Sequence, residues 1–325
     1  MKIMTRFNAT FKNFIFVALL ITALVTVLVF GMPVSVDAYD EIDTTSPVTL
    51  AVEFLSGSKI SGMEFRAYKV ANMNLNVTFE FTEEFSGYNI TMARNQAGYR
   101  AMAETLASYI ERDGIEPCKI AVTDETGRAD FGILERGLYL VMAPRYVSEE
   151  QKMANVVTPC LVALPNSIDG EKWMYDVTVS PKITEVPVPQ EGAGKTNITV
   201  ETDWTEENTA GKRPSEIAVE LISKGSVISE VKLNSKNNWS YTWEALDAGE
   251  VYFVTEKNVP SGYTVTVTRD GNTYTINNNG GVLKDDNPAK TPNLPRTGQL
   301  WWPIPVISGF LFVVLIGIVV KKKLS

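Results

Sequence analysis

The sequence predicts an all-β protein of two tandem immunoglobulin-like β-sandwich domains, the first with one inserted helix. Two observations lead to this prediction. Short runs rich in valine, isoleucine, threonine and aromatic residues alternate apolar and polar positions along residues 46–279, as half-buried strands do. Glycine, proline and asparagine interrupt these runs at short intervals, where chain reversals are expected. Apolar segments at both ends flank the pattern.

The start of the chain, residues 1–38, predicts a secretory signal peptide. Three basic residues precede the apolar run at 14–30, and small residues at 36–38 suit a signal peptidase. Cleavage after Ala38 would place the rest of the protein outside the cell.

The first domain is predicted at residues 46–183. Its opening run, 48–54, alternates as a strand does, and similar runs follow. Between them, apolar residues recur at spacings of three and four from Tyr99 to Ile110, and Gly114 follows. This spacing predicts an amphipathic helix with a glycine C-cap inside an otherwise β domain.

Residues 184–196 are predicted to be a linker. Two prolines stiffen its first half and two glycines loosen its second half. The second β-sandwich is predicted at residues 197–282, with short alternating strands. A polar stalk at 283–293 then separates it from the end of the chain, 294–325.

The C-terminal segment combines three signals in order. The pentapeptide Leu294-Pro295-Arg296-Thr297-Gly298 precedes an apolar run at 301–320 and three lysines. About 20 apolar residues cross a bilayer as a helix, and basic residues stay on the cytoplasmic side. The segment resembles the LPxTG sorting signal of Gram-positive sortase substrates. The resemblance implies cleavage between Thr297 and Gly298 and transfer of the threonyl group to the peptidoglycan cross-bridge.

Composition excludes several functions. The chain has 38 acidic and 30 basic residues, a net charge of −8 and no histidine. Without a basic stripe, nucleic acid is not an expected partner. Histidine is the commonest general base and metal ligand, and no catalytic constellation replaces it. We therefore expect no enzyme activity, no metal site and no cofactor.

The two cysteines, Cys118 and Cys160, lie in strand-like runs. In an oxidising exterior a disulfide between them is the expected state. The alternative is two free thiols that pack as small hydrophobic side chains.

The second domain resembles the B-type repeat of the collagen-binding adhesin family (Cna-B). The resemblance covers nearly all of the domain. It rests on Val200 with Trp204, on the run 213–221, and on the phrases at 238–242, 252–256, 259–263 and 274–276. Domains of this family often form an internal lysine–asparagine amide with the help of a glutamate.

The resemblance places two of these three groups in this chain. Glu256 matches the glutamate and Asn278 matches the asparagine. The lysine position, two residues before Trp204, is occupied by Thr202. Lys195 lies nine residues before Trp204, an odd offset that points to the opposite face of a strand. We therefore expect no internal amide in this domain.

The first domain resembles the N-terminal module of sortase-assembled pilins, through the strand phrases at 65–70 and 137–141 and through the family motif at its end. Trp173, Val177, Val179, Pro181 and Lys182 match it, and a serine stands where the motif has tyrosine. The resemblance implies that the amine of Lys182 attacks the acyl-enzyme formed on another subunit, giving an intermolecular isopeptide bond. The alternative is a solvated lysine that merely ends a strand.

Together these features predict a secreted, peptidoglycan-anchored pilin of a Gram-positive cell wall. A basal subunit fits best, because it needs both an acceptor amine and a sorting signal. Expected partners are sortase, the cross-bridge and other pilin subunits. The alternatives are a wall-anchored adhesin that binds host matrix or cells, and a pilus shaft subunit.

Overall fold

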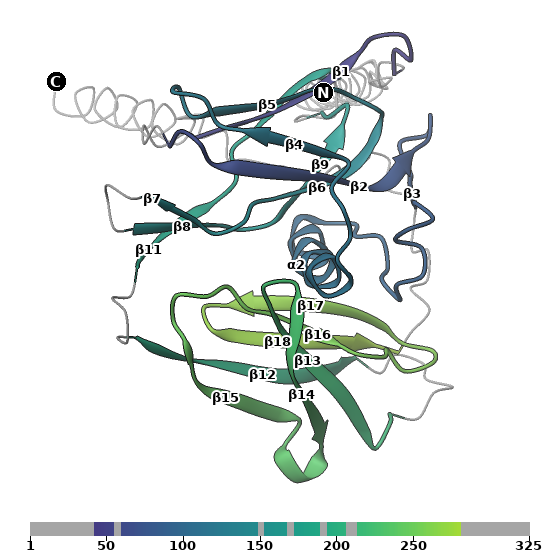
Figure 1. Cartoon of the computed structure of the whole chain (residues 1–325). Helices are drawn as coiled ribbons and strands as arrows, with labels where there is room; N and C mark the ends of the chain where they lie inside the picture. The colour runs from purple at the N-terminus through teal and green to yellow at the C-terminus, as the bar shows by residue number, and fades with distance from the viewer. Residues whose placement is uncertain are drawn as a thin grey trace, which may run out of the picture. The chain divides into compact units, whose positions relative to one another are not determined.

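The structure is a computed structural model. It describes residues 42–54, 60–148, 153–167, 172–188, 194–205 and 213–280. The all-β prediction is confirmed: strands dominate these residues, and α2 is their single α-helix (Figure 1). The predicted signal peptide, stalk and sorting signal lie outside the described residues. No helix among the described residues has the length and apolar character needed to cross a bilayer.

The first sandwich is built from three sheets. Its strands are β1 Val48–Glu53, β2 Glu64–Met73, β3 Phe79–Phe81, β4 Lys119–Val122, β5 Arg128–Leu134, β6 Gly137–Met142, β7 Tyr146–Ser148, β8 Met153–Val157, β9 Cys160–Leu164, β10 Asp176–Val179 and β11 Ile183–Pro187. The sheet orders are β10-β1-β5, β3-β2-β6-β9 with β4 also paired to β2, and β11-β8-β7. Among the described strands of this region, β1 and β10 alone pair in parallel.

The middle sheet is apolar on both faces. In β2, Phe65 belongs to one buried cluster, which it shares with β1 and β5, while Val70 belongs to a second cluster with α2. In β6, Tyr139 and Leu140 divide in the same way. Successive side chains of each strand point to opposite faces of the sheet, so the strand contributes to two cores. One core lies toward the β1 sheet and the other toward the helix.

Helix α2 spans Gln96–Asp113 and begins and ends with recognised caps. The side chain of Asn95 accepts a hydrogen bond from the Gly98 N–H at 2.8 Å, which satisfies one free donor of the first turn. Gly114 adopts a left-handed conformation at φ 65° and donates its N–H to the Ile110 carbonyl, as a C-cap glycine does. The predicted helix is confirmed.

The second sandwich follows as two sheets. Its strands are β12 Lys195–Thr205, β13 Glu216–Ser223, β14 Ser226–Asn234, β15 Ser240–Asp247, β16 Phe253–Glu256, β17 Thr264–Asp270 and β18 Thr273–Asn279, with a short 3₁₀ turn at Ser235–Asn237. The sheet orders are β15-β12-β18-β17 and β14-β13-β16. Strands β12 and β18 pair in parallel, which brings the beginning and end of the domain side by side.

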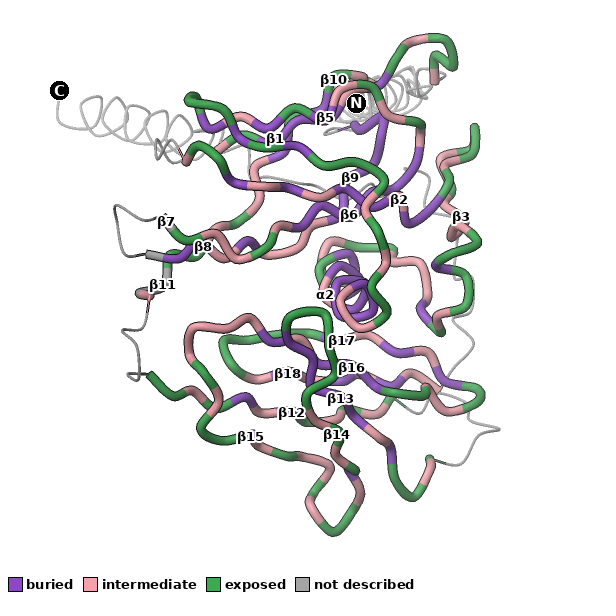
Figure 2. The backbone as a smooth tube through the Cα atoms, viewed as in Figure 1, coloured by how far each residue is buried: buried purple, intermediate pink, exposed green. Residues whose placement is uncertain are grey.

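Helix α2 packs against both sandwiches. It contacts β9 and β6 on one side and β17, β16 and β13 on the other, and Figure 2 shows it buried along most of its length. The hydroxyl of Thr105 accepts a hydrogen bond from the Val267 N–H of edge strand β17 at 2.8 Å. One continuous apolar cluster therefore runs from the first sandwich through the helix into the second.

The expected disulfide is not formed. Cys118 and Cys160 are both free cysteines. Strand order explains this. The Cys118 N–H bonds the Ala67 carbonyl of β2, Ala67 pairs with Val141 of β6, and Val141 pairs with Cys160 of β9. Three inter-strand steps separate the cysteines by roughly 14 Å, whereas a disulfide joins Cα atoms about 4.4–6.8 Å apart.

Candidate functional site

The Cna-B-like triad is assembled by three strands of the second sandwich. Thr202 lies on β12, Glu256 on β16 and Asn278 on β18. In the parallel register, Thr202 is opposite Ile276 and Trp204 is opposite Asn278. Because Ile276 and Asn278 are fully buried, Thr202 and Asn278 both lie on the core-facing side of the sheet, two positions apart.

Glu256 and Asn278 form a buried pair. The Asn278 Nδ2 donates to Glu256 Oε2 at 2.9 Å, and neither residue is exposed to solvent. Burial raises the pKa of Glu256 to about 7, although the hydrogen bond from Asn278 opposes the shift. A carboxyl group with that pKa takes up and releases a proton near neutral pH, which is what proton transfer in catalysis requires.

Thr202 lies beside this pair but does not join it. Its Oγ1 is buried without a hydrogen-bond partner, as are Glu256 Oε1 and Asn278 Oδ1. Diagonal neighbours on adjacent strands have Cβ atoms roughly 7 Å apart, a gap that the four-carbon stem of lysine spans and threonine does not. An unpaired buried polar group costs about 1–3 kcal/mol. The structure therefore brings together two members of the triad and leaves the third out of reach.

Aromatic side chains stand next to the pair. Trp204, opposite Asn278, packs edge-on against Trp239 and Tyr263 with ring centroids 5.1 and 5.4 Å apart. The guanidinium of Arg213 lies 5.0 Å from the Trp204 ring centroid. This cation–π contact was not predicted, because residue spacing alone does not show that the chain places Arg213 over the Trp204 ring. The cluster adds an apolar wall to the end of the sandwich.

Lys182 lies where the first sandwich leads into β11. Val177 and Val179 of β10 are buried and hold the strand against β1. Ser180, at the motif's tyrosine position, donates its hydroxyl to the Glu53 carbonyl at 2.6 Å. The Lys182 carbonyl accepts a hydrogen bond from the Thr158 N–H at 2.9 Å, and the residue is exposed. The backbone is thus fixed while the side chain remains accessible.

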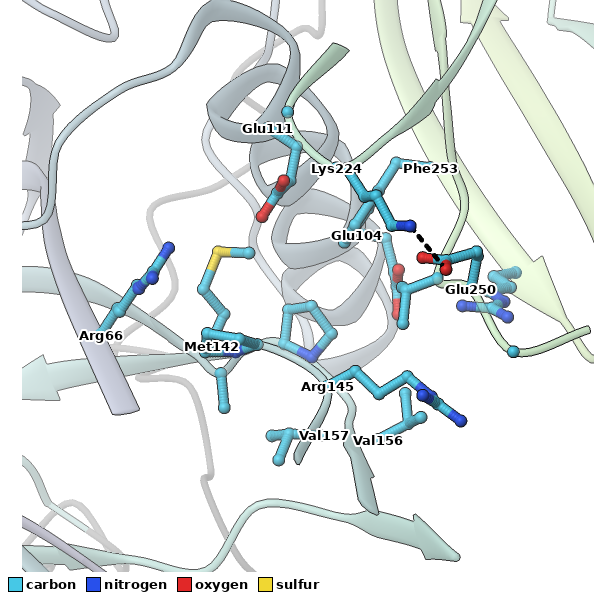
Figure 3. A pocket seen from close by; sticks show the side chains of 17 residues that line it. Arg66, Glu104, Glu111, Met142, Arg145, Val156, Val157, Lys224, Glu250 and Phe253 are labelled. Atoms are coloured by element: carbon cyan, nitrogen blue, oxygen red, sulfur yellow. Dashed lines mark ion pairs between the residues drawn. The ribbon is translucent and has the colours of Figure 1, made fainter. Parts of the chain in front are cut away.

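The exposed lysine lines a cleft. A cavity of about 700 Å³ is bordered by Lys182, Arg145 and Glu104, among others. An adjoining cavity of about 520 Å³ shares Arg145 and Glu104 and continues to Lys224, which pairs with Glu250 at 2.7 Å (Figure 3). Lys182 therefore borders a cleft that charged side chains also line.

The predicted sorting pentapeptide has no described geometry. The pentapeptide Leu294-Pro295-Arg296-Thr297-Gly298 lies outside the described residues. Among the described residues, no group of three or more histidine, cysteine, aspartate or glutamate side chains is placed to hold a metal ion.

The geometry defines a β-sandwich protein whose second sandwich carries a buried glutamate–asparagine pair. Residues 198–279 match the family described as the Cna protein B-type domain. The collagen adhesin of Staphylococcus aureus is 33% identical over 148 residues, which cover 41% of this chain and 12% of that protein. The chain thus spans a small part of this relative's length.

Solved structures give weaker resemblances. A single B repeat of the S. aureus collagen-binding protein has 18% identity and a TM-score of 0.25, covering 73% of this chain and 99% of that one. The major pilin SpaD of Corynebacterium diphtheriae has 15% identity and a TM-score of 0.30, covering 73% and 65%. The minor pilin GBS52 of Streptococcus agalactiae has 16% identity and a TM-score of 0.23, covering 75% and 100%. At these scores the resemblances carry no functional argument.

Proposed function

We propose that the chain is a structural subunit of a sortase-assembled pilus, and specifically the basal subunit that joins the pilus to peptidoglycan. The observation that carries this proposal is Lys182. Its backbone is fixed by buried neighbours in β10, its side chain is exposed, and it borders a cleft. The pentapeptide 294–298 supplies the second group that a basal subunit needs.

The assembly step is a transamidation. The Lys182 Nζ attacks the thioester carbonyl that a sortase cysteine has formed with the C-terminal threonine of another subunit. A carbon–nitrogen bond forms, the carbon–sulfur bond breaks, and the amine proton returns to the departing thiolate. The sortase supplies the catalytic groups. This chain supplies an accessible amine, so no enzyme activity of its own is required.

Attachment to the wall uses the C-terminal pentapeptide of the chain. Sortase would cleave after Thr297 and transfer that carbonyl to an amine of the peptidoglycan cross-bridge. The mature protein would then be extracellular and covalently held at one end, with Lys182 free to receive the shaft. The buried Glu256–Asn278 pair takes no part in either step.

The test is a Lys182→Arg strain, which keeps the positive charge but removes the primary amine. Wall extracts and culture medium are compared by gel with antibodies to the chain and to pilus polymers. A basal role predicts polymers released into the medium while this chain stays in the wall. A shaft role predicts loss of the polymer ladder itself. Lys195→Arg is the matched control, because Lys195 is also exposed and at a strand end. An unchanged distribution in the Lys182 variant would exclude the pilus role.

A wall-anchored adhesin is the second candidate. The 33% identity to the collagen adhesin favours it, although the match covers only 12% of that protein. Adhesion of Lys182→Arg cells to collagen-coated surfaces separates the two functions. An adhesin would bind as well as the parent strain.

A further inference from the structure

Strand β4 forms an open edge of the first sandwich. Within the part of the chain that the structure describes, it pairs with β2 and with no other strand (Figure 1). The chain leaves β4 through a turn, in which the Asp124 N–H bonds the Arg128 carbonyl at 2.9 Å, and β5 then joins the β1 sheet instead. The side of β4 that lies away from β2 is therefore available to another strand.

The backbone of β4 directs two residues to this edge. Thr123, directly after the strand, donates its N–H to the Met63 carbonyl beside β2 at 2.9 Å. The Cys118 N–H, ahead of the strand, reaches β2 one residue out of this register. Residues of an antiparallel ladder alternate between facing the partner strand and facing away from it. Counting back from Thr123, the N–H and C=O groups of Ile120 and Val122 face the open edge.

The side chains of the same two residues are apolar and exposed. Ile120 is 50% exposed and Val122 is 54% exposed, whereas Ala121 between them is buried. An exposed apolar edge is a template for pairing with another chain, and proteins commonly oppose such pairing with charged residues. Edge strand β14 of the second sandwich carries Glu230 and Lys232, each held in an ion pair. No charged residue separates the two exposed side chains of β4.

The apolar part of this edge is complementary to a second copy of itself. Two β4 strands can pair antiparallel about a two-fold axis at Ala121. Ile120 of each copy then lies opposite Val122 of the other copy, so the same apolar contact forms twice. A two-fold interface requires this kind of self-complementary surface, and cross-strand pairs of β-branched residues stabilise a ladder.

The charges at the two ends of the strand fit the same arrangement. Lys119 is exposed at the start of β4, and Asp124 and Glu125 are exposed just past its end. Antiparallel pairing about Ala121 brings the lysine of each copy beside the two acidic residues of the other copy. A parallel pair would instead place like charges together, which destabilises a ladder. Charge complementarity therefore favours a second copy in the antiparallel orientation.

We infer that β4 is a self-association site, at which two copies of this chain pair their β4 strands antiparallel about Ala121 and join their middle sheets into one. The partner is a second copy of the chain. The inference rests on the β4 edge alone and stands whether or not the chain is a pilin subunit.

The test is cysteine cross-linking of the intact chain, kept in detergent because both of its ends are apolar. Every variant also carries Cys118→Ser, which removes the exposed thiol. Ile120→Cys chains are mixed with Val122→Cys chains and oxidised. In the inferred register these two cysteines are directly opposite, with Cα atoms about 5.5 Å apart, a separation that a disulfide spans. In either variant alone the cysteines are two positions out of register, roughly 7–8 Å apart.

The mixture should therefore give several-fold more disulfide-linked dimer on a non-reducing gel than either variant alone. Ile228→Cys is the matched control, because Ile228 on edge strand β14 is also 50% exposed. It should stay monomeric. Equal amounts of dimer in the mixture and in the separate variants, or as much dimer in the Ile228 control, would overturn the inference.

Sedimentation of the chain with its own cysteines, under reducing conditions, gives a second readout. The parent chain should change from monomer to dimer as its concentration rises. Ile120→Lys puts a charge on the edge and should weaken dimerisation by about tenfold or more, whereas Ile228→Lys should leave it unchanged. A parent chain that stays monomeric, or an Ile120→Lys chain that dimerises as the parent does, would show that β4 is not the site.

Discussion

Replacing Glu256 by glutamine tests the buried carboxyl group most directly. Its pKa is about 7 in the folded protein against an ordinary value of 4.5. The folded state therefore binds the proton more tightly than the unfolded state. Its contribution to stability is fully present below pH 4.5 and is lost as the pH rises through about 7. With 1.36 kcal/mol per pKa unit, the loss amounts to about 3 kcal/mol above pH 8.

Glutamine is neutral at every pH and keeps an oxygen that accepts from Asn278. The Glu256→Gln protein should therefore match the parent near pH 4.5 and exceed it by up to about 3 kcal/mol at pH 8.5. Chemical denaturation from pH 4.5 to 8.5 measures this difference. Glu244→Gln, at an exposed position on β15, is the control for removing one carboxylate from the chain. Parallel profiles for the Glu256 variant and the parent would refute the reasoning.

The remaining predictions concern the triad, the helix contact and the cysteines. Thr202→Lys should restore the missing reactant and form an amide with Asn278, so the intact mass should fall by that of ammonia, about 17 Da, below the sequence value. The bond would close a loop of about 77 residues and add about 4–5 kcal/mol by loop-closure entropy; Thr202→Met should show neither effect. Thr105→Val should lower the free energy of unfolding by about 1–3 kcal/mol, because the Val267 N–H loses its acceptor. Thr105→Ser keeps a hydroxyl and is the control. The same unfolding midpoint for the valine and serine variants would contradict this prediction. Reduction should leave the intact mass unchanged, since Cys118 and Cys160 are free; a gain of about 2 Da would show that they pair.

The sequence predicted the helix and its cap better than it predicted which strands pair. Gly114 caps the C-terminus of the helix as predicted, because capping depends only on neighbouring residues. The cysteine prediction failed for the opposite reason. Cys118 and Cys160 do lie on or next to strands, but two strands lie between them, and strand order depends on distant pairings that alternation does not encode.

The triad shows the same division. Resemblance to a family assigned Glu256 and Asn278, and their contact at 2.9 Å agrees with that assignment. The unpaired oxygen of Thr202 was not predictable, because it follows from burial at a particular depth in the sandwich. The helix was also more buried than its spacing implied. Ala101, Ala103 and Ala107 lie on faces that a second partner covers, and their small side chains were the available signal.

In the second sandwich Thr202 stands where the resemblance places the lysine of an internal amide, so we expect packing to supply the resistance of this sandwich to unfolding. Helix α2 supplies part of it. From Val219 to Ser223, β13 is buried on both faces, although one face of a sandwich strand is ordinarily solvated. Arg112 of the helix approaches Glu220 of that strand at 3.9 Å, and the Thr105 hydroxyl occupies a free N–H of edge strand β17. Since these contacts join the two sandwiches, opening the second one requires separating it from the helix of the first. In a chain attached at Lys182 and at its C-terminus, tension would pass through this interface. The contact with helix α2 would then stabilise the second sandwich without an internal amide bond.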